Sequence, residues 1–150
     1  MILRRGVSRV KHYINNGEAI SYSYDDAGNI LNKKEYAYTT GSLGEALDTI
    51  EYQYDNDNWG DLLTSYDGNT ITYDEIGNPL NDGTWEYTWE HGRELAEMAS
   101  GEGRWSFTYD ANGMRTSKTR RNVFTDELID TYSYVYNGSQ LSQMTKNGQV

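Results

Sequence analysis

Aspartate, asparagine and glycine recur at fixed spacing in three similar phrases of this sequence. The phrases are YDDAGNIL at residues 24–31, YDEIGNPL at 73–80 and YDANGMRT at 109–116. Such residues can form a metal-binding loop, can supply a catalytic carboxylate, or can close a tight turn. Each use demands different neighbours, so the surrounding sequence can be compared with all three.

The best candidate for a metal loop is DNDNWGD at residues 55–61, which begins with the pattern D-x-D-x-x-G. An EF-hand loop also needs an oxygen ligand at its fifth position and a glutamate at its twelfth. Trp59 and Tyr66 stand at these positions. We interpret the segment as a repeat turn with an insertion, with weak adventitious calcium binding as the alternative. No metal ligand and no cofactor is predicted.

Catalytic motifs are absent from the sequence. His12 and His91 lie far apart, neither accompanies a serine or cysteine nucleophile motif, and there is no zinc spacing or phosphate-binding glycine loop. We therefore predict that the protein is not an enzyme and has no catalytic residues. The enzyme hypothesis would gain ground if two carboxylates and a histidine converged in one pocket.

The turn interpretation gives every residue of the phrase a backbone role. Aspartate favours the first position of a type I turn, where its carboxylate accepts nearby N–H groups, and glycine favours the fourth position, where φ is positive. The predicted turn-forming residues are Asp25, Gly28, Asp57, Gly60, Asp74, Gly77, Asp110 and Gly113.

The elements that carry these turns are predicted to be strands, because aromatic and aliphatic residues alternate with polar ones before each phrase. Short turn signals such as Asn16-Gly17 and Asp67-Gly68 separate them. The segment RELAEMA at 93–99 is a weak helix candidate that we interpret as strand. The repeats lie near residues 20–31, 50–63, 70–80, 85–98, 105–116 and 132–145.

This pattern predicts an all-β fold, an antiparallel meander of about a dozen short hairpin-linked strands. The meander forms either a curved sheet or a barrel-like closure. At 150 residues the chain is expected to be a single domain, with residues 1–12 as a loose N-terminal segment.

The aromatic residues have two interpretations. Trp59, Trp85, Trp89 and Trp105 could stack against sugar rings if they are exposed on a flat sheet. Other large apolar residues are scarce, so we favour a structural core built from the tryptophans together with the 14 tyrosines.

Charge and composition restrict the partners. The net charge of −10 argues against binding to nucleic acid or insertion into an anionic membrane. There is no cysteine, and neither a signal peptide nor a membrane-spanning apolar run is visible in the sequence. If the chain is exported, its export signal lies elsewhere, on a longer parent polypeptide.

The repeated phrases resemble the tyrosine–aspartate (YD, or Rhs) repeat family, which includes Rhs and wall-associated proteins, toxin-complex shell subunits and teneurins. They match its pattern Y-D-x-x-G-N/R-L, and WEHGREL at 89–95 matches a degenerate form of it. The resemblance extends over about residues 19–145. It implies a shell of β-hairpins that encloses a toxin segment or forms an extracellular scaffold, with architectural repeats and no catalytic residues.

The sequence lacks a feature of the toxin-bearing members, and this limits what the resemblance implies about function. Toxin-bearing members end in a plug with a D-P-x-G signature, whereas Pro79 is the single proline here and no such signature occurs. The resemblance therefore implies a piece of shell in a secreted or surface protein, with other segments of a larger repeat protein as partners. Open sheet edges and an uncovered aromatic face also predict a homo-oligomer.

The expected function is thus a non-catalytic structural module that encloses or displays other segments and self-associates. The alternative is a carbohydrate- or surface-binding module that uses exposed tryptophan and tyrosine on a sheet, with polysaccharide as its partner.

Overall fold

The computed structural model describes residues 7–9 and 17–150, and every regular element in these two ranges is a β-strand. The all-β class predicted from the sequence is confirmed. The chain divides into two compact units, Met1–Ile71 and Thr72–Val150, which are described separately. Within the described ranges there is no helix that could span a membrane.

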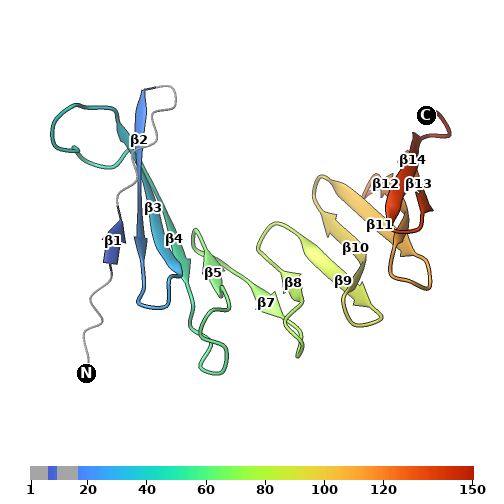
Figure 1. Cartoon of the computed structure of the whole chain (residues 1–150), viewed down its shortest axis with the longest axis horizontal. Helices are drawn as coiled ribbons and strands as arrows, with labels where there is room; N and C mark the ends of the chain where they lie inside the picture. The colour runs from blue at the N-terminus through green and yellow to red at the C-terminus, as the bar shows by residue number, and fades with distance from the viewer. Residues whose placement is uncertain (1–6, 10–16) are drawn as a thin grey trace. The chain divides into compact units, whose positions relative to one another are not determined.

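The first unit contains a six-stranded antiparallel sheet in which each strand pairs with the next one along the chain (Figure 1). Its strands are β1 (Val7–Arg9), β2 (Glu18–Tyr24), β3 (Ile30–Ala37), β4 (Asp48–Gln53), β5 (Ser65–Tyr66) and β6 (Asn69–Thr70). Of the predicted loose segment at residues 1–12, only β1 is described, and the remainder, with His12, lies outside the described residues.

The second unit contains an eight-stranded antiparallel sheet, again in sequential order. Its strands are β7 (Thr72–Tyr73), β8 (Pro79–Asn81), β9 (Glu86–Glu90), β10 (Glu94–Ser100), β11 (Gly103–Tyr109), β12 (Arg115–Arg121), β13 (Leu128–Asn137) and β14 (Gln140–Lys146). The predicted meander is confirmed, and so is the strand at RELAEMA, which lies largely within β10. Neither sheet closes on itself, so the alternative of barrel-like closure is wrong.

Pairing between strands places the aromatic residues of the second unit on one face of its sheet. Met98 of β10 lies opposite both Tyr87 of β9 and Trp105 of β11, and residues that are directly opposite share a face. Alternate residues along a strand also share a face. The aromatic face therefore carries Tyr87, Trp89, Trp105, Phe107, Tyr109, Tyr132, Tyr134 and Tyr136.

Burial in both units is shallow because each sheet is a single layer. Among the described residues, Ala19 is the one buried apolar side chain, at 3% exposure, and no large side chain is fully buried. The aromatic side chains of β9, β11 and β13 are half-buried. The expectation that they form an enclosed core is wrong, because no second layer packs on them within their unit.

Candidate functional site

The repeat turn after β7 is held by the carboxylate of Asp74. Its Oδ1 accepts the backbone N–H groups of Ile76 (3.0 Å) and Asn78 (2.8 Å), and its Oδ2 accepts the side-chain amide of Asn78 at 2.8 Å. The backbone adds a bond from the Gly77 N–H to the Asp74 carbonyl, at 3.2 Å. Both oxygens of the carboxylate thus accept hydrogen bonds from their own turn.

Asp25 repeats this arrangement. It accepts the N–H groups of Ala27 and Asn29, each at 2.9 Å, and the side-chain amide of Asn29 at 3.0 Å. Gly28 closes the turn with a φ of +96°, which belongs to the left-handed region that glycine adopts without strain. The turns at residues 24–31 and 73–80 are therefore the same structure built twice.

The third copy lacks one bond. Asp110 accepts the backbone N–H groups of Asn112 (2.8 Å) and Met114 (3.0 Å), but Met114 stands where the other copies have asparagine and has no side-chain amide to donate. Gly77 and Gly113 have φ values of +85° and +75°. Three of the four predicted aspartate–glycine pairs thus lie at the two ends of a hydrogen-bonded turn.

These hydrogen bonds favour the ionised form of the aspartates. Partial desolvation raises the pKa of Asp25 and Asp74, but the hydrogen bonds from the following asparagine and from the backbone N–H groups of the turn together outweigh it, so both pKa values lie below the usual range. A carboxylate in this state is suited to accept hydrogen bonds and is a poor proton donor.

The fourth predicted pair, Asp57 and Gly60, does not form this turn. Asn56 takes the accepting role, since its side-chain oxygen receives the N–H groups of Asn58 (3.0 Å) and Trp59 (2.9 Å). Gly60 does not have a positive φ. The prediction for Asp57 and Gly60 is wrong because the longer loop offers a second residue that can start the turn, and the backbone uses Asn56.

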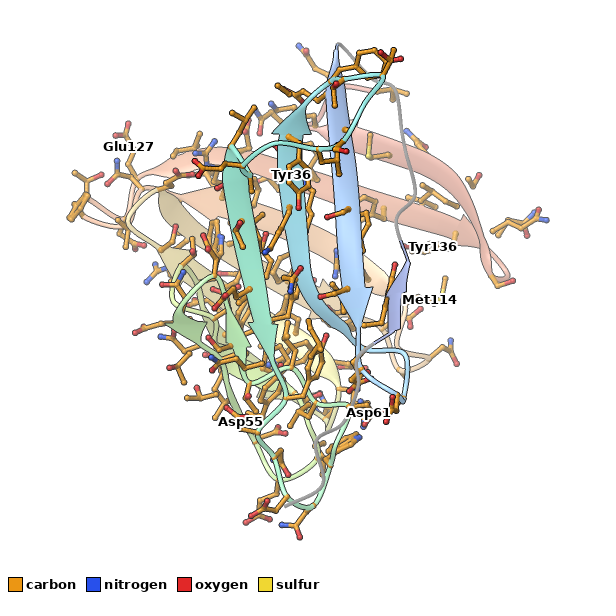
Figure 2. The ribbon with its side chains drawn as sticks, turned by 90° about the vertical axis from the view of Figure 1, so that its left-hand side faces the viewer. Tyr36, Asp55, Asp61, Met114, Glu127 and Tyr136 are labelled. Atoms are coloured by element: carbon orange, nitrogen blue, oxygen red, sulfur yellow. The ribbon has the colours of Figure 1, made fainter. Side chains whose placement is uncertain are left out.

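Figure 2 shows Asp55 and Asp61 in the loop that follows β4. Both side chains are exposed, as is that of Asp57. In the part of the chain that the structure describes, no group of three or more histidine or acidic residues is arranged to hold a metal ion.

Asn78 links its own turn to the next one along the chain. Its side-chain amide donates to the carbonyl of Gly92 at 2.6 Å, and Arg93 Nη2 donates in the opposite direction to the carbonyl of Ile76 at 2.9 Å. In the first unit, the Asn29 amide reaches the Gly60 carbonyl at 3.5 Å. This link between turns was not predicted from the sequence, although asparagine after the glycine of two phrases was a visible signal.

The last aromatic residue of three strands binds the carbonyl of a neighbouring strand. Trp89 Nε1 donates to Pro79 at 2.7 Å, the Tyr109 hydroxyl to Leu95 at 3.0 Å, and the Tyr136 hydroxyl to Arg115 at 2.9 Å. Each of these carbonyls lies near the beginning of a return strand, next to a turn. These side chains therefore fasten one hairpin to the next.

The four tryptophans proposed for ligand stacking differ in their surroundings. Trp59 is 43% exposed and lies in the first unit, whereas Trp85, Trp89 and Trp105 lie half-buried in the second. Trp89 is fixed by the bond to Pro79, and the Trp105 ring lies under Lys118 Nζ at 4.2 Å from its centroid. The structure thus leaves Trp59 as the most exposed of the four.

A pocket of about 200 Å³ lies between the His91–Gly92 turn and the end of β11. Glu90, His91 and Glu94 line it together with Phe107 and Tyr109. His91 Nδ1 lies 3.1 Å from Glu94 Oε2, and the histidine side chain is 77% exposed. Two carboxylates and a histidine therefore do meet in one pocket, the arrangement that the enzyme hypothesis requires.

His91 also has an unusual backbone conformation. Its φ of 47° is followed by 88° at Gly92, as expected for a two-residue hairpin turn of type I′. Asp67-Gly68 and Asn147-Gly148 have the same pair of positive φ values. His91 thus occupies a position that asparagine or aspartate usually takes, so the turn geometry does not by itself require a histidine.

Comparison with known proteins gives no family for the chain, because no family model matches it. A curated relative is the tRNA3(Ser)-specific nuclease WapA of Bacillus spizizenii, which is 29% identical to the chain over 160 residues. The match includes 93% of the chain, and the chain spans about 6% of the length of this relative.

These comparisons overturn the family predicted from the sequence. The predicted membership of the tyrosine–aspartate repeat family is wrong, because no model of that or any other family matches and the likeness found is a distant one to a nuclease. The phrases on which the resemblance was based are turns whose geometry follows from Asp, Gly and Asn alone. The secreted or surface location, which was inferred from that resemblance, stays a prediction.

Proposed function

We propose that this chain is a non-catalytic structural segment of a longer secreted or surface-displayed polypeptide. Its hairpins build a wall that encloses or displays other segments and associates with further copies of itself. The observation that carries the proposal is the use of the repeated residues: Asp25, Asp74 and Asp110 bond to their own turns, and Asn78 bonds to the next turn.

Shallow burial supports the same function. A single-layer sheet with half-buried aromatic side chains on one face has apolar surface that a partner can cover. The end strand β14 pairs with β13 along one side, and most of its residues are exposed. Such an edge is available for pairing with another chain or segment.

Light scattering on the purified chain tests self-association. We expect a mass that is a multiple of 17.2 kDa at micromolar concentration. A mass equal to one chain under these conditions would contradict self-association. The proposed lack of catalytic activity is tested separately by incubating the chain with tRNA, which we expect to stay intact.

Acid–base catalysis at the pocket of Glu90, His91 and Glu94 is a second candidate function. It is favoured by the close approach of His91 Nδ1 to Glu94 Oε2, because a carboxylate can orient a histidine that transfers protons. The name of the relative makes tRNA the substrate to test. Cleavage that is lost in His91→Ala and Glu94→Gln, and kept in Glu102→Gln at an exposed turn, would establish this function in place of the first.

Carbohydrate binding, the alternative from the sequence, depends on a ring face that is free to stack. Trp59 meets this condition best, with 43% of its surface exposed. Titration of tryptophan fluorescence with polysaccharides tests it, with Trp59→Phe as the variant. Quenching by a defined sugar that disappears in this variant would support carbohydrate binding, and a flat response supports the structural function.

A further inference from the structure

Strand β12 places three cationic side chains on the aromatic face of the second unit. Arg115 lies opposite Tyr109, Lys118 opposite Phe107 and Arg120 opposite Trp105 in the pairing of β11 with β12. A bulge beside Arg115 brings it to the same face as the other two. The cations thus form a row between the aromatic residues of β11 and those of β13.

Each cation in this row lies over an aromatic ring. Lys118 Nζ is 4.2 Å from the ring centroid of Trp105 and 5.3 Å from that of Tyr132. Arg120 Cζ is 5.3 Å from the Trp105 centroid, and Arg115 Cζ is 4.5 Å from the Phe107 centroid. Contacts at these distances are attractive and hold the cations on the sheet.

On the opposite face of the same strands, the arginines have carboxylate partners. There Arg121 lies 4.0 Å from Asp126, and Arg104 pairs with Asp126 and also approaches Glu97 to 3.7 Å. These arginines are neutralised by carboxylates of their own chain. The comparison shows that acidic partners are available around this sheet.

On the aromatic face, by contrast, no described carboxylate forms an ion pair with the row. Within the described residues, no acidic oxygen lies within 4.0 Å of a charged nitrogen of Arg115, Lys118 or Arg120. Asp130 lies opposite Arg120 in the register, but it bonds to Lys146 at 3.0 Å. In a chain of net charge −10 with 23 acidic residues, it is unexpected that no described carboxylate lies within ion-pair distance of these three cations, although Asp130 attracts Arg120 from a longer distance.

Two of these cations also have unsatisfied donors. The Nε atoms of Arg115 and Arg120 are shielded from solvent and have no hydrogen-bond partner. The bonds that the two guanidinium groups do make are long, 3.3 Å to the Tyr109 hydroxyl and 3.4 Å to the Glu102 carbonyl. A shielded donor without a partner is costly, so the chain's own acceptors leave these two guanidinium groups only partly satisfied.

Spacing indicates which anion fits. Lys118 and Arg120 are two residues apart in one strand, which places their Cα atoms roughly 6.8 Å apart. Carboxylates at alternate positions of an extended peptide have the same spacing, and the apolar parts of such a peptide can contact the ring edges between the cations. A long polyanion such as RNA fits less well, because it extends beyond the three cations and meets more of the strongly acidic chain than a short peptide does.

We infer that Arg115, Lys118 and Arg120 form a docking site for an extended acidic peptide segment that lies on the aromatic face and carries carboxylates at alternate positions. The segment pairs its carboxylates with Lys118 and Arg120, while Arg115 extends the site toward the turn at residues 109–116. The inference goes beyond the proposed function and requires that further copies associate through a sheet edge such as β14, because a copy packed on the aromatic face would cover the site.

The test uses the whole chain and a short fluorescein-labelled peptide of alternating Glu and Leu, with fluorescence anisotropy as the readout. We expect binding that weakens as salt is added, and no binding of the matching Lys and Leu peptide. Lys118→Gln combined with Arg120→Gln should lower the affinity by about tenfold or more. The control Arg121→Gln removes one charge from the opposite face of β12 and should change the affinity by less than about twofold.

Folding of each variant is checked by near-ultraviolet circular dichroism, and Lys118→Arg with Arg120→Lys, which keeps both charges, should retain binding. The wild-type chain already provides a decisive result, because failure to bind the acidic peptide overturns the inference whatever the variants do. Equal losses in Arg121→Gln and in the double variant would also overturn it. Tighter binding of a single-stranded RNA or an anionic polysaccharide would assign the site to that partner instead.

Discussion

The side-chain amide of Asn78 donates to the carbonyl of Gly92 across 2.6 Å, although 14 residues separate the two in sequence. The same amide donates to Asp74 at 2.8 Å, so one side chain completes its own turn and fixes the next. Asn78 is 3% exposed and is among the few buried polar residues of the described chain. Because few side chains of the described residues are buried, we expect such links between turns to contribute to stability.

Replacing Asn78 with alanine should therefore be costly. Asn78→Ala removes both bonds and leaves the Gly92 carbonyl without this donor, which should lower the free energy of unfolding by about 1–3 kcal/mol. Urea denaturation measures the change. Asn29→Ala is the matched control, because its amide lies 3.5 Å from the Gly60 carbonyl and the link is weaker. Equal losses in the two variants would contradict the importance of the turn-to-turn bond.

Gly28 and Gly60 offer a clean comparison of backbone conformation. A Cβ added at either position would meet no atom within 4 Å, but Gly28 has a φ of +96° and Gly60 does not have a positive φ. Gly28→Ala should lower the free energy of unfolding by roughly 1 kcal/mol or more, because an L-residue is strained in this region. Gly60→Ala should be neutral or slightly stabilising. Thermal denaturation of the two variants measures the difference, and a similar cost at both positions would mean that steric contact matters more than φ.

Local features of this fold could be predicted from the sequence. Aromatic residues at alternate positions predict strands, and an aspartate three residues before a glycine predicts a turn, because both signals act within a few residues. The prediction failed at Asp57, where Asn56 lies next to it and competes for the same backbone donors. It also failed for the aromatic core, since no local pattern tells whether a second layer will cover a sheet.

Non-local contacts could not be predicted in this way. The bond from Asn78 to Gly92 and the row of Arg115, Lys118 and Arg120 over aromatic rings depend on the register between strands. A bulge of one residue at Arg115 shifts that register, and nothing in the phrase YDANGMRT indicates the bulge. The pocket at His91 was stated as a condition on the enzyme hypothesis, but its members could be named only from the structure.

Acid should weaken the turns at Asp25 and Asp74. The pKa of each carboxyl is lower in the folded state than its unfolded value of about 3.9, so the stabilisation is fully present above that value and is lost as the pH falls through the folded pKa. Urea denaturation at a series of pH values should show stability falling below about pH 4. Asp25→Asn with Asp74→Asn should show a smaller fall over this range. An equally steep fall in the double variant would assign the acid sensitivity to other carboxyls.

Two tyrosines in β13 separate the role of a hydroxyl from the role of its ring. Tyr134 and Tyr136 are both half-buried on the aromatic face, but only the Tyr136 hydroxyl bonds to a described residue, donating to the carbonyl of Arg115 at 2.9 Å. Tyr136→Phe should lower the free energy of unfolding by about 1 kcal/mol, because the carbonyl loses its donor while the ring stays in place. Tyr134→Phe removes a hydroxyl of the same kind and should cost less than about 0.5 kcal/mol.

Chemical denaturation of both variants and the wild type gives the comparison, and amide hydrogen exchange at Arg115 and its neighbours shows whether the loss is local. If Tyr134→Phe proves as damaging as Tyr136→Phe, the aromatic residues contribute through ring packing alone and the proposed fastening of hairpin to hairpin by side-chain donors is refuted.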